Sequence, residues 1–122
     1  MREKIRDKSR ILDIIAYSKN VIEFVKDSSY EKFVKDKLLF YAVMKNVEII
    51  GEAAYMLSKE FKQEHPETPW DMVQGMRHVL VHDYARVNSN RLWSTAVNDI
   101  PVICQQAETY FVQTDWEKWE EE

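Results

Sequence analysis

Glycine and proline are scarce in this chain of 122 residues, which contains two glycines and three prolines. An all-β sandwich or barrel needs a turn about every eight to twelve residues, and such turns depend on these two residue types. Gly51 and Gly75 also stand too far apart to form the Gly-x-Gly core of a nucleotide-binding loop. The scarcity therefore excludes an all-β fold and a glycine-rich phosphate loop.

Disulfides, membrane-spanning runs and a leader segment are also missing from the sequence. Cys104 is the single cysteine, so no disulfide can form within the chain, which fits a reducing compartment. No apolar run approaches the roughly 20 residues that a spanning helix needs, and residues 1–6 show no apolar signal segment. With 45% hydrophobic and 31% charged residues, the composition is that of one folded domain. We expect a cytoplasmic, soluble protein without membrane contact.

Charge is distributed unevenly, although the formal net charge is only −4. Residues 113–122 carry a net charge of −4, so the rest of the chain is neutral overall. Within that rest, residues 1–10 carry +3 and residues 76–92 carry +2. Basic segments on an acidic protein can follow the phosphates of a nucleic acid, but a solvated helix face of mixed charge gives the same pattern.

Apolar residues recur at three- and four-residue spacing, which predicts an all-α protein: an antiparallel bundle of four to five helices. We expect helices over 4–27, 30–64 (its start near 33–36 could be a separate turn), 69–82, and from 88 or 89 to about 111. Gly51 inside the second helix indicates close approach of another helix. The helical domain spans 1–114, and residues 115–122 form an acidic tail that we expect to fray.

Polar residues at the expected helix ends set the boundaries. Thr68 is expected to cap the third helix, with Pro69 in its first turn, and Asn88 or Ser89 the fourth. Pro101 is expected to kink or interrupt the last helix, because proline lacks the amide hydrogen that a helix interior requires.

One polar cluster, residues 77–84 (RHVLVHDY), gathers the chemically active side chains. His78 and His82 lie four residues apart on one helix face, a spacing that zinc ligands use. A zinc site needs three or four ligands, however, and Val79 stands where zinc proteases have a glutamate. Asp83 is expected to point away from that face. We therefore expect no metal and no other cofactor.

The five-residue spacing of Arg77 and His82 separates them by about 140° on a helix, so they would not converge within one chain. Across a two-fold axis, two arginines and two histidines could line one cleft and cleave RNA without a metal. The ordinary alternative is that Arg77 pairs with a carboxylate such as Glu52 and that His82 caps a helix end.

A family resemblance favours the first reading. Arg77, His82 and Tyr84 are spaced as R-x4-H-x-Y, and His78 follows the arginine directly. The stretches NVEIIGEA (46–53), HPETPW (65–70), GMR (75–77) and LVHDY (80–84) accompany this motif in order. From about residue 5 to residue 111, the sequence thus resembles HEPN-domain proteins, in particular the HepT-type toxins of the HEPN/MNT toxin–antitoxin pair.

The resemblance implies a dimeric, metal-independent endoribonuclease that acts on cellular RNA, with tRNA among the targets. By position, Arg77 and His82 would be catalytic, and His78 and Asp83 supporting. The partner would be an MNT nucleotidyltransferase that neutralises the toxin by transferring AMP to Tyr84. We add the inference that Glu52 orients Arg77.

Two alternatives remain at the level of the sequence. The chain could be a non-catalytic HEPN module that docks a nucleotidyltransferase and assists its binding of nucleotide or substrate, although such modules need not keep the R-x4-H-x-Y motif. It could also be a structural dimer whose basic N-terminal segment binds a partner.

Overall fold

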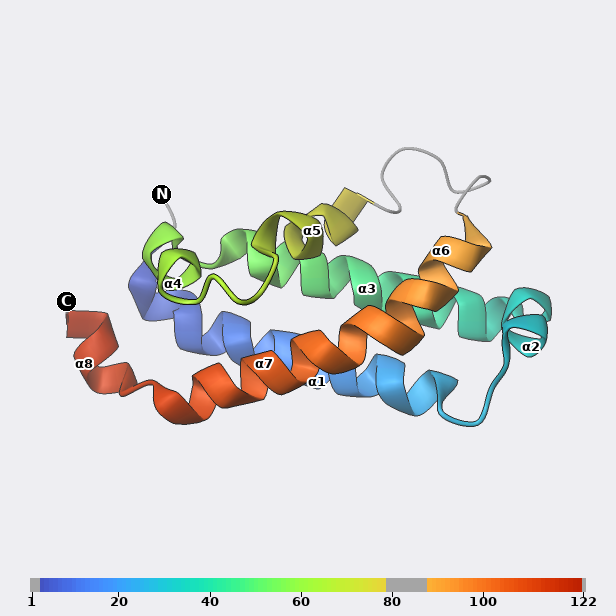
Figure 1. Cartoon of the computed structure of the whole chain (residues 1–122), viewed down its shortest axis with the longest axis horizontal. Coiled ribbons are helices and arrows are strands. Elements are labelled where there is room, and N and C mark those ends of the chain that lie inside the picture. Colours follow the sequence, from blue (N-terminus) through green and yellow to red (C-terminus); the bar gives the residue numbers. More distant parts are fainter. Residues whose placement is uncertain (1–2, 79–87, 122) are drawn as a thin grey trace.

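A computed structural model describes residues 3–78 and 88–121, and within these ranges every regular element is helical (Figure 1). The α-helices are α1 (Asp7–Val25), α2 (Tyr30–Lys35), α3 (Lys37–Met56), α4 (Lys59–Glu64), α5 (Trp70–Gly75), α6 (Ser89–Ser94), α7 (Ile100–Gln113) and α8 (Trp116–Glu121). Two 3₁₀ turns, η1 (Lys4–Arg6) and η2 (Met76–His78), and a π-helical segment, η4 (Thr95–Asp99), complete the described chain. The predicted all-α class is confirmed.

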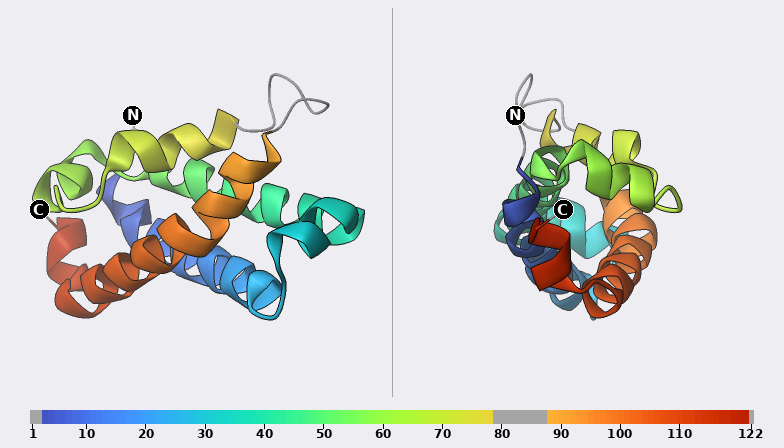
Figure 2. Two further views of the ribbon diagram at one scale, coloured as in Figure 1. Left: turned by 45° about the vertical axis from the view of Figure 1, so that its right-hand side comes forward. Right: turned by 90° about the vertical axis from the view of Figure 1, so that its left-hand side faces the viewer.

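Three long helices, α1, α3 and α7, form the body of the molecule, and both α3 and α7 run opposite to α1 (Figure 1). The end-on view in Figure 2 shows the helices arranged around a common interior. The largest fully buried side chains fill that interior: Phe33, Phe61, Ile11, Ile14, Met44, Ile50, Leu57 and Ile100. Burying such a side chain contributes roughly 1.5–3 kcal/mol, so this core is the main source of stability.

The helix expected over 30–64 is divided into α2, α3 and α4: the separation near 33–36 is included in the expectation, but the break at 57–58 is not. Asp36 leaves the helical conformation and accepts a hydrogen bond from the Leu39 backbone nitrogen at 3.1 Å, which caps α3. Leu57 and Ser58 are extended, and the Ser58 hydroxyl accepts from the Phe61 nitrogen at 3.1 Å, which caps α4. Short polar side chains favour such breaks because they replace the missing backbone partners at a helix start.

The expected cap of the third helix is also wrong. Thr68 is buried, and its hydroxyl lies 2.7 Å from Gln106 Oε1 and 2.5 Å from the Tyr110 hydroxyl, so it joins the linker to α7 instead of capping α5. Pro69 occupies the N-cap position without a side-chain hydrogen bond. The α-helix ends at Gly75, continues as the 3₁₀ turn η2 to His78, and the rest of the expected helix lies outside the described residues.

The expected start of the fourth helix is confirmed. The Asn88 side chain accepts a hydrogen bond from the Arg91 backbone nitrogen at 3.0 Å and caps α6. The chain stays helical through Pro101, the second residue of α7. The wider π-helical turn η4 precedes the proline, so the expected disturbance takes the form of a changed helix type and not of a break.

The acidic tail does not fray within the described residues. It forms α8, whose start is capped by Asp115, which accepts from the Lys118 nitrogen at 3.2 Å. Trp116 stacks on Phe61 with ring centroids 5.9 Å apart, and the Trp119 indole nitrogen donates to the buried Asp7 carboxylate at 3.0 Å. Two aromatic side chains therefore attach the tail to the body of the molecule.

Among the described helices, none has the length and apolar character that crossing a bilayer requires. The structure contains one chain, so the two-fold dimer stays a prediction.

Candidate functional site

The close packing of η2 on α3 fixes the position of Arg77. A Cβ atom built on Gly51 would overlap the Arg77 backbone nitrogen and lie 2.8 Å from the Met76 carbonyl carbon. Only glycine lets the two backbones approach this closely. The expected role of Gly51 is thereby confirmed, with the approaching element a 3₁₀ turn.

Two neighbours hold the Arg77 guanidinium group. Its Nε donates to the Nε2 atom of His78 at 3.2 Å. Its central carbon lies 3.3 Å from the centroid of the Tyr55 ring, so the flat face of the cation rests on the aromatic face. Cations prefer this position because the faces of aromatic rings are electronegative. The arginine is therefore restrained along one edge and on one face.

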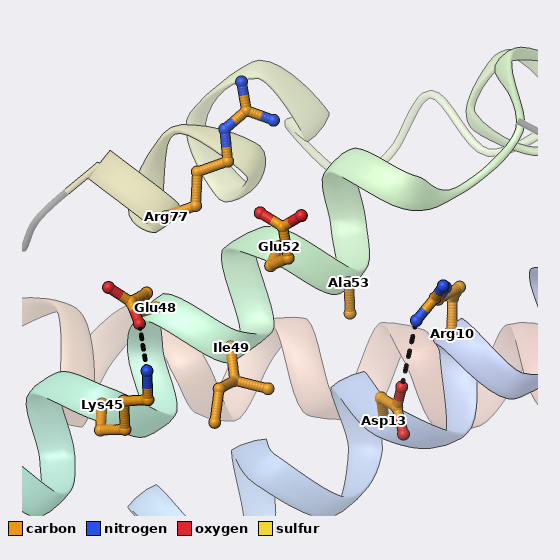
Figure 3. A pocket seen from close by; sticks show the side chains of 8 residues that line it. All are labelled: Arg10, Asp13, Lys45, Glu48, Ile49, Glu52, Ala53 and Arg77. Carbon is orange, nitrogen blue, oxygen red and sulfur yellow. Dashed lines mark hydrogen bonds and ion pairs between the residues drawn. The ribbon is translucent and has the colours of Figure 1, made fainter. Parts of the chain in front are cut away.

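A pocket of about 370 Å³ opens beside this arginine, between α1, α3 and η2 (Figure 3). Its lining combines two apolar side chains with six charged ones: Arg10, Asp13, Lys45, Glu48, Ile49, Glu52, Ala53 and Arg77. Lys45 Nζ lies 2.7 Å from Glu48, and Arg10 lies 3.9 Å from Asp13. Two of the three carboxylates thus have cationic partners of their own.

Glu52 and Arg77 share this pocket, as expected, but among the described residues no ion pair within 4.0 Å joins them. The alternative in which Arg77 pairs with Glu52 is therefore not observed. The group on α3 that contacts the cation is Tyr55, which is not among the predicted site residues. The available signal was its spacing, since Tyr55 follows Gly51 by four residues and so lies on the same helix face.

Of the predicted site residues, the structure describes Arg77, His78 and Glu52 and brings all three to the junction of η2 and α3. His82, Asp83 and Tyr84 lie outside the described residues. Within the described ranges, no three His, Cys, Asp or Glu side chains are grouped as ligands for a metal ion. That search does not reach His82 and Asp83, so the expectation of a metal-free site stays a prediction.

Perturbed pKa values occur away from this junction. Burial, with smaller contributions from nearby Glu108, raises the pKa of the Cys104 thiol to about 11, so the thiol stays protonated and unreactive at neutral pH. Burial also lowers the pKa of His65, which stacks on Tyr110 with ring centroids 4.1 Å apart. Neither residue lines the pocket beside Arg77.

The described site can bind an anion through the guanidinium group of Arg77. A guanidinium group remains charged at every physiological pH and offers paired donors to phosphate oxygens. Within the described part of the chain, the two terminal nitrogens of Arg77 donate to no residue.

Comparisons with known proteins agree with this reading. The family model described as "Ribonuclease HepT-like" matches residues 14–110. A "Putative RNase" of Methanocaldococcus jannaschii is 36% identical over 101 residues, covering 83% of this chain and 93% of the relative. A "Putative RNase" of Caldanaerobacter subterraneus subsp. tengcongensis is 44% identical over 86 residues, covering 70% and 77%. The "Probable ribonuclease HepT" of Thermococcus cleftensis is 38% identical over 94 residues, covering 77% and 86%. No solved structure matches the chain.

Proposed function

Because the chain belongs to the HepT-like ribonuclease family, we propose that it is a metal-independent endoribonuclease and the toxin of a toxin–antitoxin pair. The observation that carries the proposal is the guanidinium group of Arg77, held by Tyr55 and His78 beside a pocket. A fixed cation of this kind is what a reaction at a phosphodiester needs, since negative charge accumulates on the phosphate oxygens in the transition state.

In the proposed reaction, the 2′-hydroxyl of a ribose attacks the adjacent phosphorus atom. His82 of one subunit takes the proton from this hydroxyl, and a second histidine gives a proton to the departing 5′-oxygen as the P–O5′ bond breaks. Arg77 stabilises the charge on the non-bridging oxygens. The products are a 2′,3′-cyclic phosphate and a 5′-hydroxyl. Because the nucleophile belongs to the substrate, no metal is required to activate water.

A two-fold dimer would complete the site. If the helical pattern continued beyond η2, Arg77 and His82 would be about 140° apart, so each histidine would more readily meet the arginine of the other subunit. In this arrangement His78 and Asp83 support the catalytic pair from the same segment. Glu52 borders the site from α3.

The proposed substrate is cellular RNA, tRNA included, and the proposed partner is an MNT nucleotidyltransferase antitoxin. This partner would transfer AMP from ATP to the Tyr84 hydroxyl and release pyrophosphate. The added phosphodiester brings bulk and negative charge close in sequence to Arg77 and His78. It would thereby occupy the positive site intended for the RNA phosphate and switch the nuclease off.

Cleavage of total RNA in the presence of EDTA tests the nuclease. We expect the wild-type protein to be active, and Arg77→Ala and His82→Ala each to lose about 10²–10⁴-fold in rate, the usual contribution of a positioned catalytic group. Lys26→Ala, which removes an exposed cation at the end of α1, serves as the control and should keep the activity. Cleavage that stops with EDTA and returns with Zn²⁺ or Mg²⁺ would contradict the mechanism.

Mass spectrometry after co-expression with an MNT protein tests the regulation. We expect a mass increase of one or more AMP groups on the peptide that contains Tyr84, together with relief of growth arrest. Tyr84→Phe should remain toxic in the presence of the transferase activity. If the wild-type toxin is neutralised while Tyr84 is unmodified, inhibition proceeds by complex formation alone and this part of the proposal is wrong.

A further inference from the structure

We propose that Tyr55 is a positioning residue for Arg77: its ring fixes the plane of the guanidinium group so that the terminal edge alone is presented to the RNA phosphate. This inference rests on the proposed ribonuclease function. It assigns a role to a residue of α3 that lies outside the R-x4-H-x-Y motif.

The number of free donors on the arginine limits how it can bind a phosphate. A guanidinium group has five N–H donors in one plane. The Nε donor is already used by His78 at 3.2 Å. The side-on mode, in which Nε and one terminal nitrogen bind two oxygens together, is therefore not available. What remains is the edge formed by the two terminal nitrogens, which matches two oxygens of one phosphate.

The Tyr55 ring restricts the movement of the Arg77 side chain. With the guanidinium carbon 3.3 Å from the ring centroid, one face of the cation is covered. An arginine at the surface ordinarily samples many rotamers, and their loss on binding a ligand opposes binding. The ring removes part of this freedom before RNA arrives, because rotation of the guanidinium group would break the cation–π contact.

Two carboxylates lie near the arginine and could compete for it. Glu48 and Glu52 lie along α3 on the pocket side of Arg77 (Figure 3). Without a competing contact, they would attract the guanidinium group into the pocket and neutralise it. Glu48 is bonded to Lys45 at 2.7 Å, and Arg77 rests on Tyr55 instead of pairing with Glu52. The aromatic ring therefore keeps the cation away from the acidic side chains that would mask it.

A double-mutant cycle on RNA cleavage tests the role. Loss of a cation–π contact predicts that Tyr55→Leu lowers kcat/KM by about 2- to 30-fold, while Tyr55→Phe, which keeps the ring, stays within about twofold of wild type. In an Arg77→Ala background, Tyr55→Leu should have no further effect. An equal loss from Tyr55→Leu in both backgrounds would show a general structural role and overturn the proposal.

A second measurement does not depend on cleavage. Protons of the Arg77 side chain that lie over the ring should have NMR signals shifted upfield by the ring current. We expect Tyr55→Phe to keep this shift and Tyr55→Leu to abolish it. If the shift is present but no variant cleaves RNA, the ribonuclease function fails while the contact stands. If the wild-type protein cleaves RNA and shows no such shift, the positioning role is wrong.

Discussion

Gly51, in the middle of α3, lies directly against the backbone nitrogen of Arg77, at a separation that leaves no room for a side chain. This contact joins the longest buried helix to the turn that carries the catalytic arginine of the proposed reaction. It also places Arg77 above Tyr55, one helical turn further along α3. The absence of a side chain at Gly51 thus determines how closely Arg77 approaches α3 and the pocket.

Replacing this glycine tests the relationship. In Gly51→Ala the new methyl group would overlap backbone atoms of η2, which cannot rotate aside as a side chain could. We expect the free energy of unfolding to fall by about 1–3 kcal/mol, as for other overpacked sites. The rate of RNA cleavage should also fall when it is measured under conditions in which the variant is fully folded, so the loss of stability does not explain it.

Gly75→Ala is the matched control for that measurement. No atom lies within 4 Å of the Cβ position at Gly75, and none of the described residues has a positive φ. Alanine in a helix is favoured over glycine by about 0.5–1 kcal/mol, so this variant should be as stable as the wild type or slightly more stable. Equal urea midpoints for both variants would contradict the assigned role of Gly51.

The contrast between Asn88 and Thr68 shows how far the sequence could predict this fold. Asn88 caps α6 because its partner, the Arg91 nitrogen, is three residues away, and local patterns describe local contacts. Thr68 carries the same kind of signal, but its hydroxyl is bonded to Gln106 and Tyr110, about forty residues further on. A short window of sequence cannot reveal contacts between residues that are so far apart in the chain.

The same limit applies to the candidate site. The family resemblance pointed to Arg77 and His78, Glu52 was added by inference, and the structure places all three at one junction. The spacing of Tyr55 from Gly51 places both on one helix face, but the contact with Arg77 also depends on how closely η2 packs on α3, which the sequence does not give. Likewise, the break at Ser58 depends on Asp7, an acceptor 51 residues earlier.

Asp7 provides a second prediction, on stability. This fully buried carboxylate accepts hydrogen bonds from the Ser58 nitrogen at 2.8 Å, the Ser58 hydroxyl at 2.6 Å and the Trp119 indole at 3.0 Å. Asp7→Ala would leave buried donors without an acceptor, so we expect a loss of about 1–3 kcal/mol or more in urea unfolding. Asp27→Ala removes an exposed carboxylate and should change the stability by less than about 0.5 kcal/mol.

A third prediction concerns α8, which lies beyond the segment matched by the family model. Trp116 covers Phe61, so Trp116→Ala should lower the free energy of unfolding by about 1–3 kcal/mol through lost apolar and ring–ring contact. The rate of RNA cleavage should be unchanged below the melting temperature. Val112→Ala, at a side chain that is 82% exposed, is the control. If Trp116→Ala were as stable as this control, α8 would not be attached as the structure indicates.

Cys104 supports a fourth prediction. With the pKa of its thiol raised to about 11, only a small fraction is thiolate at pH 8, and the side chain is buried. Reaction with a thiol reagent at that pH should be more than tenfold slower than for free cysteine, whose pKa is about 8.5, and should accelerate in urea. Rapid labelling of the folded protein would show that Cys104 on α7 is more accessible to solvent than its burial in the structure indicates.

His65 gives the last prediction, a dependence of stability on pH. Its ring stacks on Tyr110 and lies 4.5 Å from Phe61 between ring centroids, and burial lowers its pKa in the folded state although Glu67 and Glu64 act in the opposite direction. The unfolded state, with a pKa of about 6.5, therefore binds the proton more readily than the folded state. Where the unfolded state binds more protons, stability rises with pH. The contribution of His65 is fully present above about pH 6.5 and declines as the pH falls below that value.

Urea midpoints at several pH values between 8 and 5 will measure this decline in the wild type and in His65→Phe, which keeps the ring stacking without a titrating group. We expect the wild type to lose more stability than the variant below about pH 6.5, and parallel curves would show that burial of His65 does not control the acid response.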